Sequence, residues 1–375
     1  MIKNALAELA AQGQSVWLDN ITRDLIQRGK LKSLIEAGLR GITSNPTIFQ
    51  KTIESGHAYD QQIAQLAGQG KAPEAIYEAL TISDIQAACD QLQVVYEREH
   101  GADGFASIEV NPKLSRDTEG SIAEARRLWR EVNRPNLMVK IPGTREGVPA
   151  VKECLSEGIN INITLLFSRG NHERVMYAYL EALESRLKAG QPIRNIASVA
   201  SFFVSRVDTL VDELLEKQIA SAQDKSEKER LRNLLGKAGI ANAKLAYDRF
   251  RKIFDSDRFM ALQLKGARVQ RPLWASTSTK NPVYRDVMYV EELIGPNTVN
   301  TVPDKTLDAL EDHAQIERTV DSELHHAENV MEALKLAGIR FDAVTPQLED
   351  EGIEKFNESY DEVVAGVRGK LAAAR

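Results

Sequence analysis

Short apolar runs alternate with longer amphipathic stretches along most of the chain. Several of the short runs carry apolar residues at consecutive positions rather than at alternating ones. Strands of a parallel sheet show this pattern because helices cover both faces of the sheet. We therefore predict eight strands, in this order: 15–19, 41–45, 105–110, 136–142, 162–168, 196–203, 272–278 and 297–303.

Helical patterns separate these strands. Apolar residues recur every three or four positions, the spacing of one helix face, in the segments 60–99, 118–133, 147–157, 168–188, 206–253 and 321–336. The N-terminal stretch MIKNALAELAAQGQ leads directly into the first strand, so we interpret it as a first helix rather than a cleaved signal.

Eight strands with intervening helices predict an α/β fold: a single (β/α)₈ TIM barrel over 1–375. Two gaps between strands, 46–104 and 204–271, are much longer than one crossover, and we expect additional helices inserted there, after strands 2 and 6. A doubly wound open sheet is the main alternative. That fold commonly has a Gly-rich turn after its first strand, whereas SVWLDN is followed here by ITRDLIQRG.

Composition and charge narrow the range of partners. The chain has 375 residues, with 48 Lys and Arg against 54 Asp and Glu, so the net charge is −6. This balance argues against a nucleic-acid binder. The charged segment 221–237 has no aromatic residue and is most simply a solvated helix face, with partner binding as the alternative.

The sequence also bears on the compartment. No apolar stretch approaches the roughly 18 residues of a membrane span. The only two cysteines, Cys89 and Cys154, lie in helical patterns without a CxxC motif, and we interpret them as packing residues. A reducing compartment, the cytoplasm, is the expected location.

Polar residues end most of the predicted strands. In α/β barrels the chemistry lies at the C-terminal ends of the strands, so these residues are expected to meet at one mouth. They are Asp19, Thr43, Ser44, Asn45, Glu109, Asn111, Lys140, Asn162, Thr164, Ser201 and 276–280.

Lys140 is the most informative of them, because it lies within the apolar strand LMVKIP. Burial of an ammonium without a partner is costly, and desolvation favours the neutral amine, which can attack a ketone to form a Schiff base. A lysine paired with a carboxylate at the barrel rim is the structural alternative.

Schiff-base chemistry also needs groups that move protons. Asp19, Glu109 and Thr164 could supply them. Each has a plain structural alternative: Asp19 as the N-cap of the next helix, Glu109 in a rim salt bridge, and Thr164 as a β-branched strand residue. Their joint placement at strand ends favours catalysis.

At these positions the sequence resembles the transaldolase family, over nearly the whole chain. The motifs, in the family's order, are WLDN, GITSNPTIF, SIEVNPKLS, VKIPGTREG, GININITLLFS, SVASFFVSRVD and WASTSTKN. The chain length resembles that of the longer bacterial branch. The resemblance implies a (β/α)₈ enzyme of the non-oxidative pentose phosphate pathway that uses no metal and no organic cofactor.

The implied reaction moves a dihydroxyacetone unit from sedoheptulose 7-phosphate to glyceraldehyde 3-phosphate, giving erythrose 4-phosphate and fructose 6-phosphate. Lys140 would be the Schiff-base nucleophile. Asp19 would take the C4-hydroxyl proton during cleavage and return it in the reverse step. Glu109 and Thr164 would hold and activate the catalytic water.

The resemblance also implies substrate-binding residues. Asn45, Asn162 and Ser201 match positions that hold the dihydroxyacetone hydroxyls. Arg206 matches a phosphate-binding arginine, although on the sequence alone a surface salt bridge is its simplest interpretation. Lys280, with Ser278 beside it, stands where many relatives have a second phosphate-binding arginine, and a lysine is a point charge rather than a planar fork.

Some residues are left without a catalytic role. Asn111 stands where some relatives carry an aspartate. His325 and His326 look like a metal pair, but adjacent helix residues point in different directions, so we expect surface or packing positions and no metal. Phe203 could pack near the catalytic water or simply fill the barrel.

Two other functions stay open. One is a Schiff-base aldolase that releases free dihydroxyacetone, as in shorter relatives that cleave fructose 6-phosphate. The other is a non-catalytic helical scaffold using 221–237, which would make the strand-end residues a coincidence. The expected partners are sugar phosphates, with no nucleic acid and no membrane. The sequence leaves a monomer and a homodimer equally open.

Overall fold

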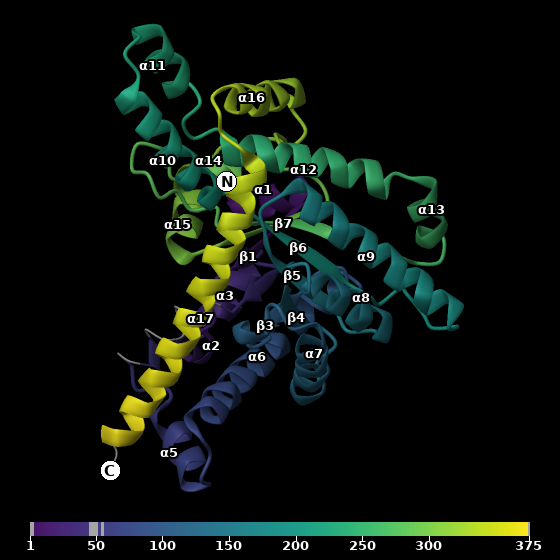
Figure 1. Cartoon of the computed structure of the whole chain (residues 1–375). Coiled ribbons are helices and arrows are strands. Elements are labelled where there is room, and N and C mark those ends of the chain that lie inside the picture. Colours follow the sequence, from purple (N-terminus) through teal and green to yellow (C-terminus); the bar gives the residue numbers. More distant parts are fainter. Residues whose placement is uncertain (1–3, 45–51, 54–55, 374–375) are drawn as a thin grey trace.

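Eight parallel strands close into a barrel in the order β1-β2-β3-β4-β5-β6-β7-β8, with β8 pairing back to β1. The computed structural model describes residues 4–44, 52–53 and 56–373 (Figure 1). This closed barrel confirms the predicted (β/α)₈ fold and excludes the open doubly wound sheet. The strands are β1 (Gln14–Leu18), β2 (Gly41–Thr43), β3 (Phe105–Glu109), β4 (Leu137–Pro142), β5 (Ile161–Leu166), β6 (Ser198–Phe203), β7 (Arg271–Ala275) and β8 (Thr298–Val302).

The strands are buried along nearly their whole length, which is why their sequences are continuously apolar. All eight lie where the sequence predicted them. Most end one to three residues earlier than predicted, so that Asp19 and Ser44, for example, lie just beyond β1 and β2.

Helices surround the barrel (Figure 1). The first half of the chain forms α1 (Ala5–Ala11), α2 (Arg23–Gln27), α3 (Lys30–Ala37), α5 (Asp60–Gly68), α6 (Pro73–Arg98), the 3₁₀ helix η1 (Pro112–Leu114), α7 (Thr118–Val132), α8 (Gly147–Glu157) and α9 (Arg169–Lys188). The second half forms α10 (Ser205–Ser221), α11 (Lys225–Arg232), α12 (Ala238–Phe254), α13 (Asp257–Gln263), α14 (Met288–Glu291), α15 (Asp304–His313), α16 (Leu324–Leu336) and α17 (Phe341–Ala373).

The two long gaps between strands are helical in their described parts. The gap after β2 contains α5 and α6, and the gap after β6 contains α10, α11, α12 and α13. Most side chains of 221–237 are exposed, as expected for a solvated segment, although Leu231 and Leu234 are buried.

The longest helix described, α17, was not predicted from the sequence. It runs from the neighbourhood of α10 to α5, and its last turns lie beside α5 (Figure 1). Along the way it contacts η1, β5 and α6. Val344, Leu348 and Ile353 pack in one apolar cluster, whereas Val363 and Val367 pack in another with Ile63 and Ile76 of α5 and α6. The final helix thus bridges both insertions.

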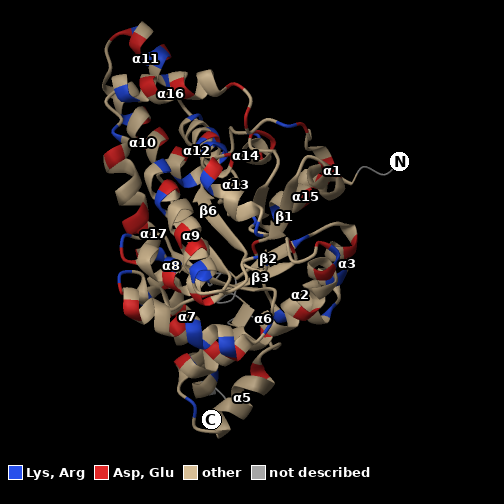
Figure 2. Cartoon of the chain, turned by 90° about the vertical axis from the view of Figure 1, so that its right-hand side faces the viewer, with Lys and Arg blue, Asp and Glu red and all other residues tan. Residues whose placement is uncertain are grey.

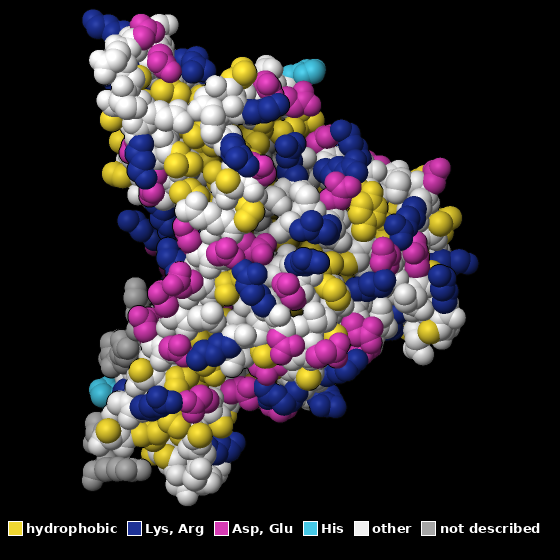
Figure 3. All heavy atoms as spheres, in the orientation of Figure 1, with side chains coloured by type: hydrophobic (Ala, Val, Ile, Leu, Met, Phe, Trp, Pro, Cys, Tyr) yellow, Lys and Arg dark blue, Asp and Glu magenta, His cyan; other side chains and the backbone are white. Residues whose placement is uncertain are grey.

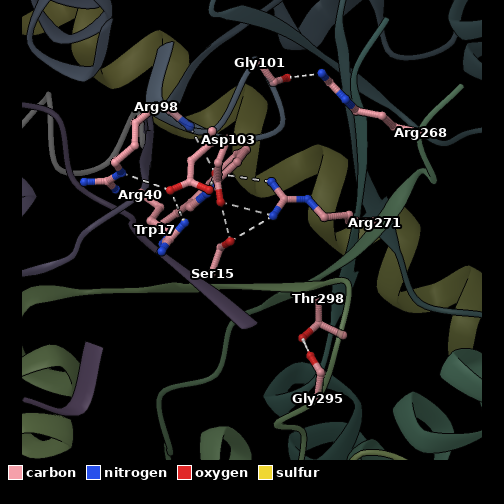
Figure 4. A network of polar contacts seen from close by, with 12 residues as sticks. Ser15, Trp17, Arg40, Arg98, Gly101, Asp103, Arg268, Arg271, Gly295 and Thr298 are labelled. Atoms are coloured by element: carbon pink, nitrogen blue, oxygen red, sulfur yellow. Dashed lines mark hydrogen bonds and ion pairs between the residues drawn. The ribbon is translucent and has the colours of Figure 1, made fainter. Parts of the chain in front are cut away.

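A buried polar network closes the N-terminal end of the barrel (Figure 4). The Asp103 carboxylate accepts hydrogen bonds from Trp17 Nε1 at 3.0 Å and from Ser15, and it pairs with Arg271 at 3.2 Å. Asp103 is 3% exposed, and these three donors compensate the buried negative charge of its carboxylate. We assign this network a role in stability rather than in chemistry, because active sites of α/β barrels lie at the C-terminal ends of the strands.

Charges of both signs are interspersed over the surface. Figure 2 shows acidic and basic residues on the same helices, and the face in Figure 3 has no large area of one sign. Among the described helices, none has a stretch long and apolar enough to span a membrane.

Candidate active site

A cavity of about 420 Å³ lies at the C-terminal ends of the strands. Of the ten site residues predicted from the sequence, the following line it: Asp19, Glu109, Lys140, Thr164, Ser201, Arg206, Ser278 and Lys280. Asn162 is fully buried and is not part of the lining. Asn45 lies outside the described residues. The structure therefore brings most of the predicted residues to one place.

Lys140 and Glu109 face each other across β3 and β4. The two residues are direct partners in the register of these strands. Lys140 Nζ lies 2.6 Å from Glu109 Oε1, and both side chains are largely buried, with 10% and 13% of their surface exposed. The carboxylate–lysine pair that the sequence analysis weighed as a structural alternative is thus present, and it lies inside the cavity.

Thr164 owes its position to an irregularity in β5. The register between β5 and β6 shifts between Ile163 and Leu166, and Leu165 has a φ of 59°, which non-glycine residues seldom adopt. Thr164 is 1% exposed, and its hydroxyl has no hydrogen-bond partner within the described part of the chain. A buried, unsatisfied hydroxyl that lines a cavity is suited to holding a water molecule.

Asp19 follows β1 directly, and its backbone N–H donates to Val302 at 2.9 Å. The Thr43 hydroxyl donates to Asp19 Oδ1 at 2.9 Å, which fixes one carboxylate oxygen. The N-cap interpretation of Asp19 is wrong, because Thr22 caps α2 by accepting from Leu25 N. A fixed carboxylate in the cavity can accept a proton from a bound hydroxyl.

Asn162 and Ser201 form a chain of side-chain hydrogen bonds inside the barrel. The Ser201 hydroxyl donates to Asn162 Oδ1 at 2.7 Å, and Asn162 Nδ2 donates to Ser107 at 3.1 Å. These two bonds hold the Asn162 side chain in place within the barrel. Of the pair, only Ser201 reaches the cavity.

Three cations that line the cavity lie near one another: Arg206, Lys280 and Lys355. Arg206 lies in the first turn of α10, and its guanidinium carbon is 5.1 Å from the ring centroid of Phe203. Burial lowers the pKa of Arg206 from its usual range. Lys280 donates to the Ser278 hydroxyl at 3.1 Å, and its pKa is lowered by burial and by the nearby Arg206 and Lys355. Clustered cations of this kind favour a multiply charged anion.

Phe203 is both a packing residue and part of the cavity wall. It lines the cavity, is 7% exposed, and packs on Phe167 with ring centroids 5.1 Å apart. Asn111, by contrast, accepts a hydrogen bond from Lys113 N and caps η1, which is a structural role.

The structure does not point to a metal centre. Within the described ranges, no three His, Cys, Asp or Glu side chains are grouped so that they could hold an ion. His325 is exposed and contacts Glu328 at 3.1 Å, in agreement with its expected surface position.

The contribution of α17 to the cavity was not predicted from the sequence. This helix adds five lining residues: Lys355, Phe356, Glu358, Ser359 and Glu362. They lie roughly 190 to 225 residues beyond β4 and β5, and no strand end or turn marks them. A helix placed over the mouth leaves no signal in the strand pattern.

Comparisons with known proteins all point to one family and cover nearly the whole chain. A family model described as Transaldolase/Fructose-6-phosphate aldolase matches residues 16–367. A protein of Trichodesmium erythraeum named Transaldolase is 48% identical over 374 residues, which cover 99% of this chain and 98% of the relative. A Mycolicibacterium smegmatis protein with the same name is 48% identical over 372 residues, with 99% and 98% covered. A Nostoc protein named Transaldolase 2 is 47% identical over 375 residues, with the same coverage.

Proposed function

Because the chain belongs to the transaldolase/fructose-6-phosphate aldolase family, we propose that it carries out the transaldolase reaction in the mouth cavity, through a Schiff base at Lys140. The reaction transfers a dihydroxyacetone unit from sedoheptulose 7-phosphate to glyceraldehyde 3-phosphate. The observation that carries the assignment is the placement of Lys140, 8% exposed and 2.6 Å from a carboxylate, in the wall of that cavity.

The first half of the cycle forms the imine. The Lys140 amine attacks C2 of the ketose, and the carbinolamine loses water to give a protonated imine. Glu109 is in contact with the lysine nitrogen and can receive and return protons at that point. The unsatisfied hydroxyl of Thr164 would hold the water that is released and later re-enters.

Carbon–carbon cleavage needs a base at the C4 hydroxyl, and Asp19 is proposed for this role. Its carboxylate takes the hydroxyl proton, the C3–C4 bond breaks, and the electron pair moves into the imine, leaving a three-carbon enamine on Lys140. The aldehyde product leaves. In the second half, C3 of the enamine attacks the acceptor aldehyde, and Asp19 returns its proton to the new alkoxide.

Substrate recognition is divided between the two sides of the cavity. Ser201 would hold a dihydroxyacetone hydroxyl, together with Asn162 and Asn45. Arg206, Lys280 and Ser278 would bind the phosphate, which is supported by the clustering of positive charge there. The buried free thiols Cys89 and Cys154 support a reducing compartment, and we propose the cytoplasm.

The proposal is tested by borohydride reduction in the presence of fructose 6-phosphate without an acceptor aldehyde, followed by peptide mass spectrometry. We expect a reduced three-carbon adduct on Lys140. Absence of an adduct in folded protein, or an adduct on another lysine, would contradict the mechanism.

A further inference from the structure

The C-terminal helix α17 forms one wall of the candidate active site. It lies close to the barrel at Gly352, where an added Cβ atom would lie 2.8 Å from the side chain of Leu165 in β5. Phe356 and Ser359 follow at helical spacing on the same face, and both line the cavity. A Cβ atom at this position would require the tip of the Leu165 side chain to shift, so this face of α17 packs directly on the barrel.

Two ion pairs lie along the helix on either side of Phe356. Arg116 pairs with Asp350, and Lys113 Nζ lies 2.6 Å from Asp361. Both cations belong to the segment that follows β3, the strand that ends in Glu109. Exposed ion pairs contribute little each, and apolar packing near both ends of α17 holds the helix against the barrel.

Further along, Lys370 Nζ contacts the Gly56 carbonyl and the Asp60 carboxylate, each at 2.6 Å. Arg368 pairs with Glu74 in the same region. These contacts join the end of α17 to α5 and α6. The segment after β2 therefore holds the helix across the barrel mouth.

Phe356 lies near the Lys140 nitrogen. Lys140 Nζ lies 5.7 Å from the centroid of the Phe356 ring, within the range of a cation–π contact. The ring is half-buried and packs against the apolar cluster that contains Phe203. An aromatic face thus covers Lys140, while Glu109 contacts the same nitrogen atom.

We propose that Phe356 is a further catalytic residue, which covers the Lys140 imine and keeps water from the bound three-carbon unit. This inference rests on the proposed function. The enamine on Lys140 has two fates. In transfer, C3 bonds to the acceptor aldehyde. In hydrolysis, C3 takes a proton, water adds to C2, and the carbinolamine collapses to free dihydroxyacetone and the lysine amine. Only hydrolysis consumes a water molecule before any acceptor has reacted, and the ring opposes it.

The test is the ratio of the two fates in one reaction mixture. Fructose 6-phosphate is supplied as donor and erythrose 4-phosphate as acceptor, and free dihydroxyacetone and sedoheptulose 7-phosphate are both quantified. We expect Phe356→Ala to raise the ratio of dihydroxyacetone to sedoheptulose 7-phosphate by about tenfold, because the truncated side chain admits water. Phe356→Leu should raise it less, by about two- to threefold, because most of the volume is kept.

Phe341→Ala is the matched control. Phe341 also lies on α17 and packs in the same apolar cluster, but it is not part of the cavity lining. Its truncation should weaken the helix packing and leave the product ratio unchanged. A rise in this control equal to that in Phe356→Ala would show a general loosening of the helix and overturn the assignment.

The Leu variant also keeps the test decisive if Phe356→Ala does not fold. A product ratio equal to that of the unmodified protein in every folded Phe356 variant overturns the proposal. Borohydride trapping of the unmodified protein separates this outcome from failure of the proposed function. An adduct on Lys140 with an unchanged ratio removes only the role of Phe356, whereas no adduct removes the Schiff base itself.

Discussion

Lys140 Nζ and Glu109 Oε1 lie 2.6 Å apart at the mouth of the barrel, on adjacent strands whose register places the two residues opposite each other. An ion pair with about a tenth of each side chain exposed could be purely structural. Its location in a cavity, beside the Phe356 ring and the unsatisfied Thr164 hydroxyl, makes the same pair suited to proton transfer. The catalytic assignment can therefore be tested against the structural one.

Lys140→Met should abolish turnover by several orders of magnitude, because a thioether cannot form an imine. The variant also leaves Glu109 without its partner, at a cost to stability of about 3 kcal/mol. Steady-state assays with protein shown to be folded by circular dichroism measure the first effect, and denaturant titration measures the second.

Lys244→Met is the control for Lys140→Met. Lys244 is 4% exposed and pairs with Glu292 at 2.9 Å, but it belongs to α12 and does not line the cavity. Its loss should lower stability while activity stays within about twofold. Equal losses of activity in both variants would mean that Lys140 acts only through stability.

Asp19→Ala should form the imine and then accumulate it. Condensation at C2 does not need the Asp19 carboxylate, whereas cleavage needs a base at the C4 hydroxyl. Borohydride trapping with fructose 6-phosphate should therefore give an uncleaved six-carbon adduct on Lys140 in this variant. Asp24→Ala, in the partly exposed first turn of α2, should behave like the unmodified protein. A three-carbon adduct in Asp19→Ala would assign the cleavage base to another group.

Lys280→Gln should raise the KM for fructose 6-phosphate by at least about tenfold, since a hydrogen bond to a charged group contributes roughly 1.5–3 kcal/mol. The catalytic constant should change little, because the phosphate lies away from the reacting carbons. With unphosphorylated fructose as donor, the variant and the unmodified protein should have the same kcat/KM. Lys228→Gln, on the exposed helix α11, is the control for a general change in charge. Equal losses with both sugars would exclude a role for Lys280 in phosphate binding.

Much of the barrel could be predicted from the sequence, because strands buried on both faces require continuous apolar runs. The helix α17 could not be predicted in this way. Its apolar residues face different neighbours along its length: Leu348 packs near α10 and β5, whereas Val363 packs with α5 and α6. No single apolar stripe therefore runs through it, and Pro346 interrupts the helical pattern near its start.

The site followed from the strand ends only in part. Residue type and position were sufficient to predict that Lys140 and Glu109 lie at the barrel mouth, because each lies at or near the end of a strand. Their contact depends on the register of β3 and β4, which the sequence does not reveal. The position of Thr164 in the cavity wall depends on the irregular backbone at Leu165. The contribution of Phe356 depends on where α17, which is distant in the sequence, crosses the mouth of the barrel.

A last prediction concerns a buried carboxyl group outside the cavity. Asp208 in α10 is 1% exposed, and its Oδ1 accepts from Gly239 N–H at 2.7 Å. Burial raises the pKa of Asp208 to about 7 from a usual 3.8. The Asp212 carboxylate adds to this rise, while hydrogen bonds from Gly239 and Tyr289 oppose it.

The sign of the pH effect follows from this rise. Between about pH 4 and pH 7 the folded protein binds more protons at Asp208 than the unfolded chain does, so the Asp208 contribution to the free energy of unfolding falls as pH rises through that window. Above about pH 7 both states are ionised, and the cost of burying the charge is fully present. Asp208→Asn keeps an acceptor for Gly239 N–H and carries no charge.

We therefore expect Asp208→Asn to gain stability relative to the unmodified protein between pH 5 and pH 8, by at least about 1 kcal/mol, since one pKa unit corresponds to about 1.4 kcal/mol. Denaturant titrations of both proteins at each pH give the difference, in which the titration of all other groups cancels. Asp224 lies at the exposed start of α11, so its carboxyl group is not buried. The difference in stability between Asp224→Asn and the unmodified protein should therefore be constant across this pH range. The same constant difference for Asp208→Asn would mean that Asp208 is ionised in the folded protein throughout this range.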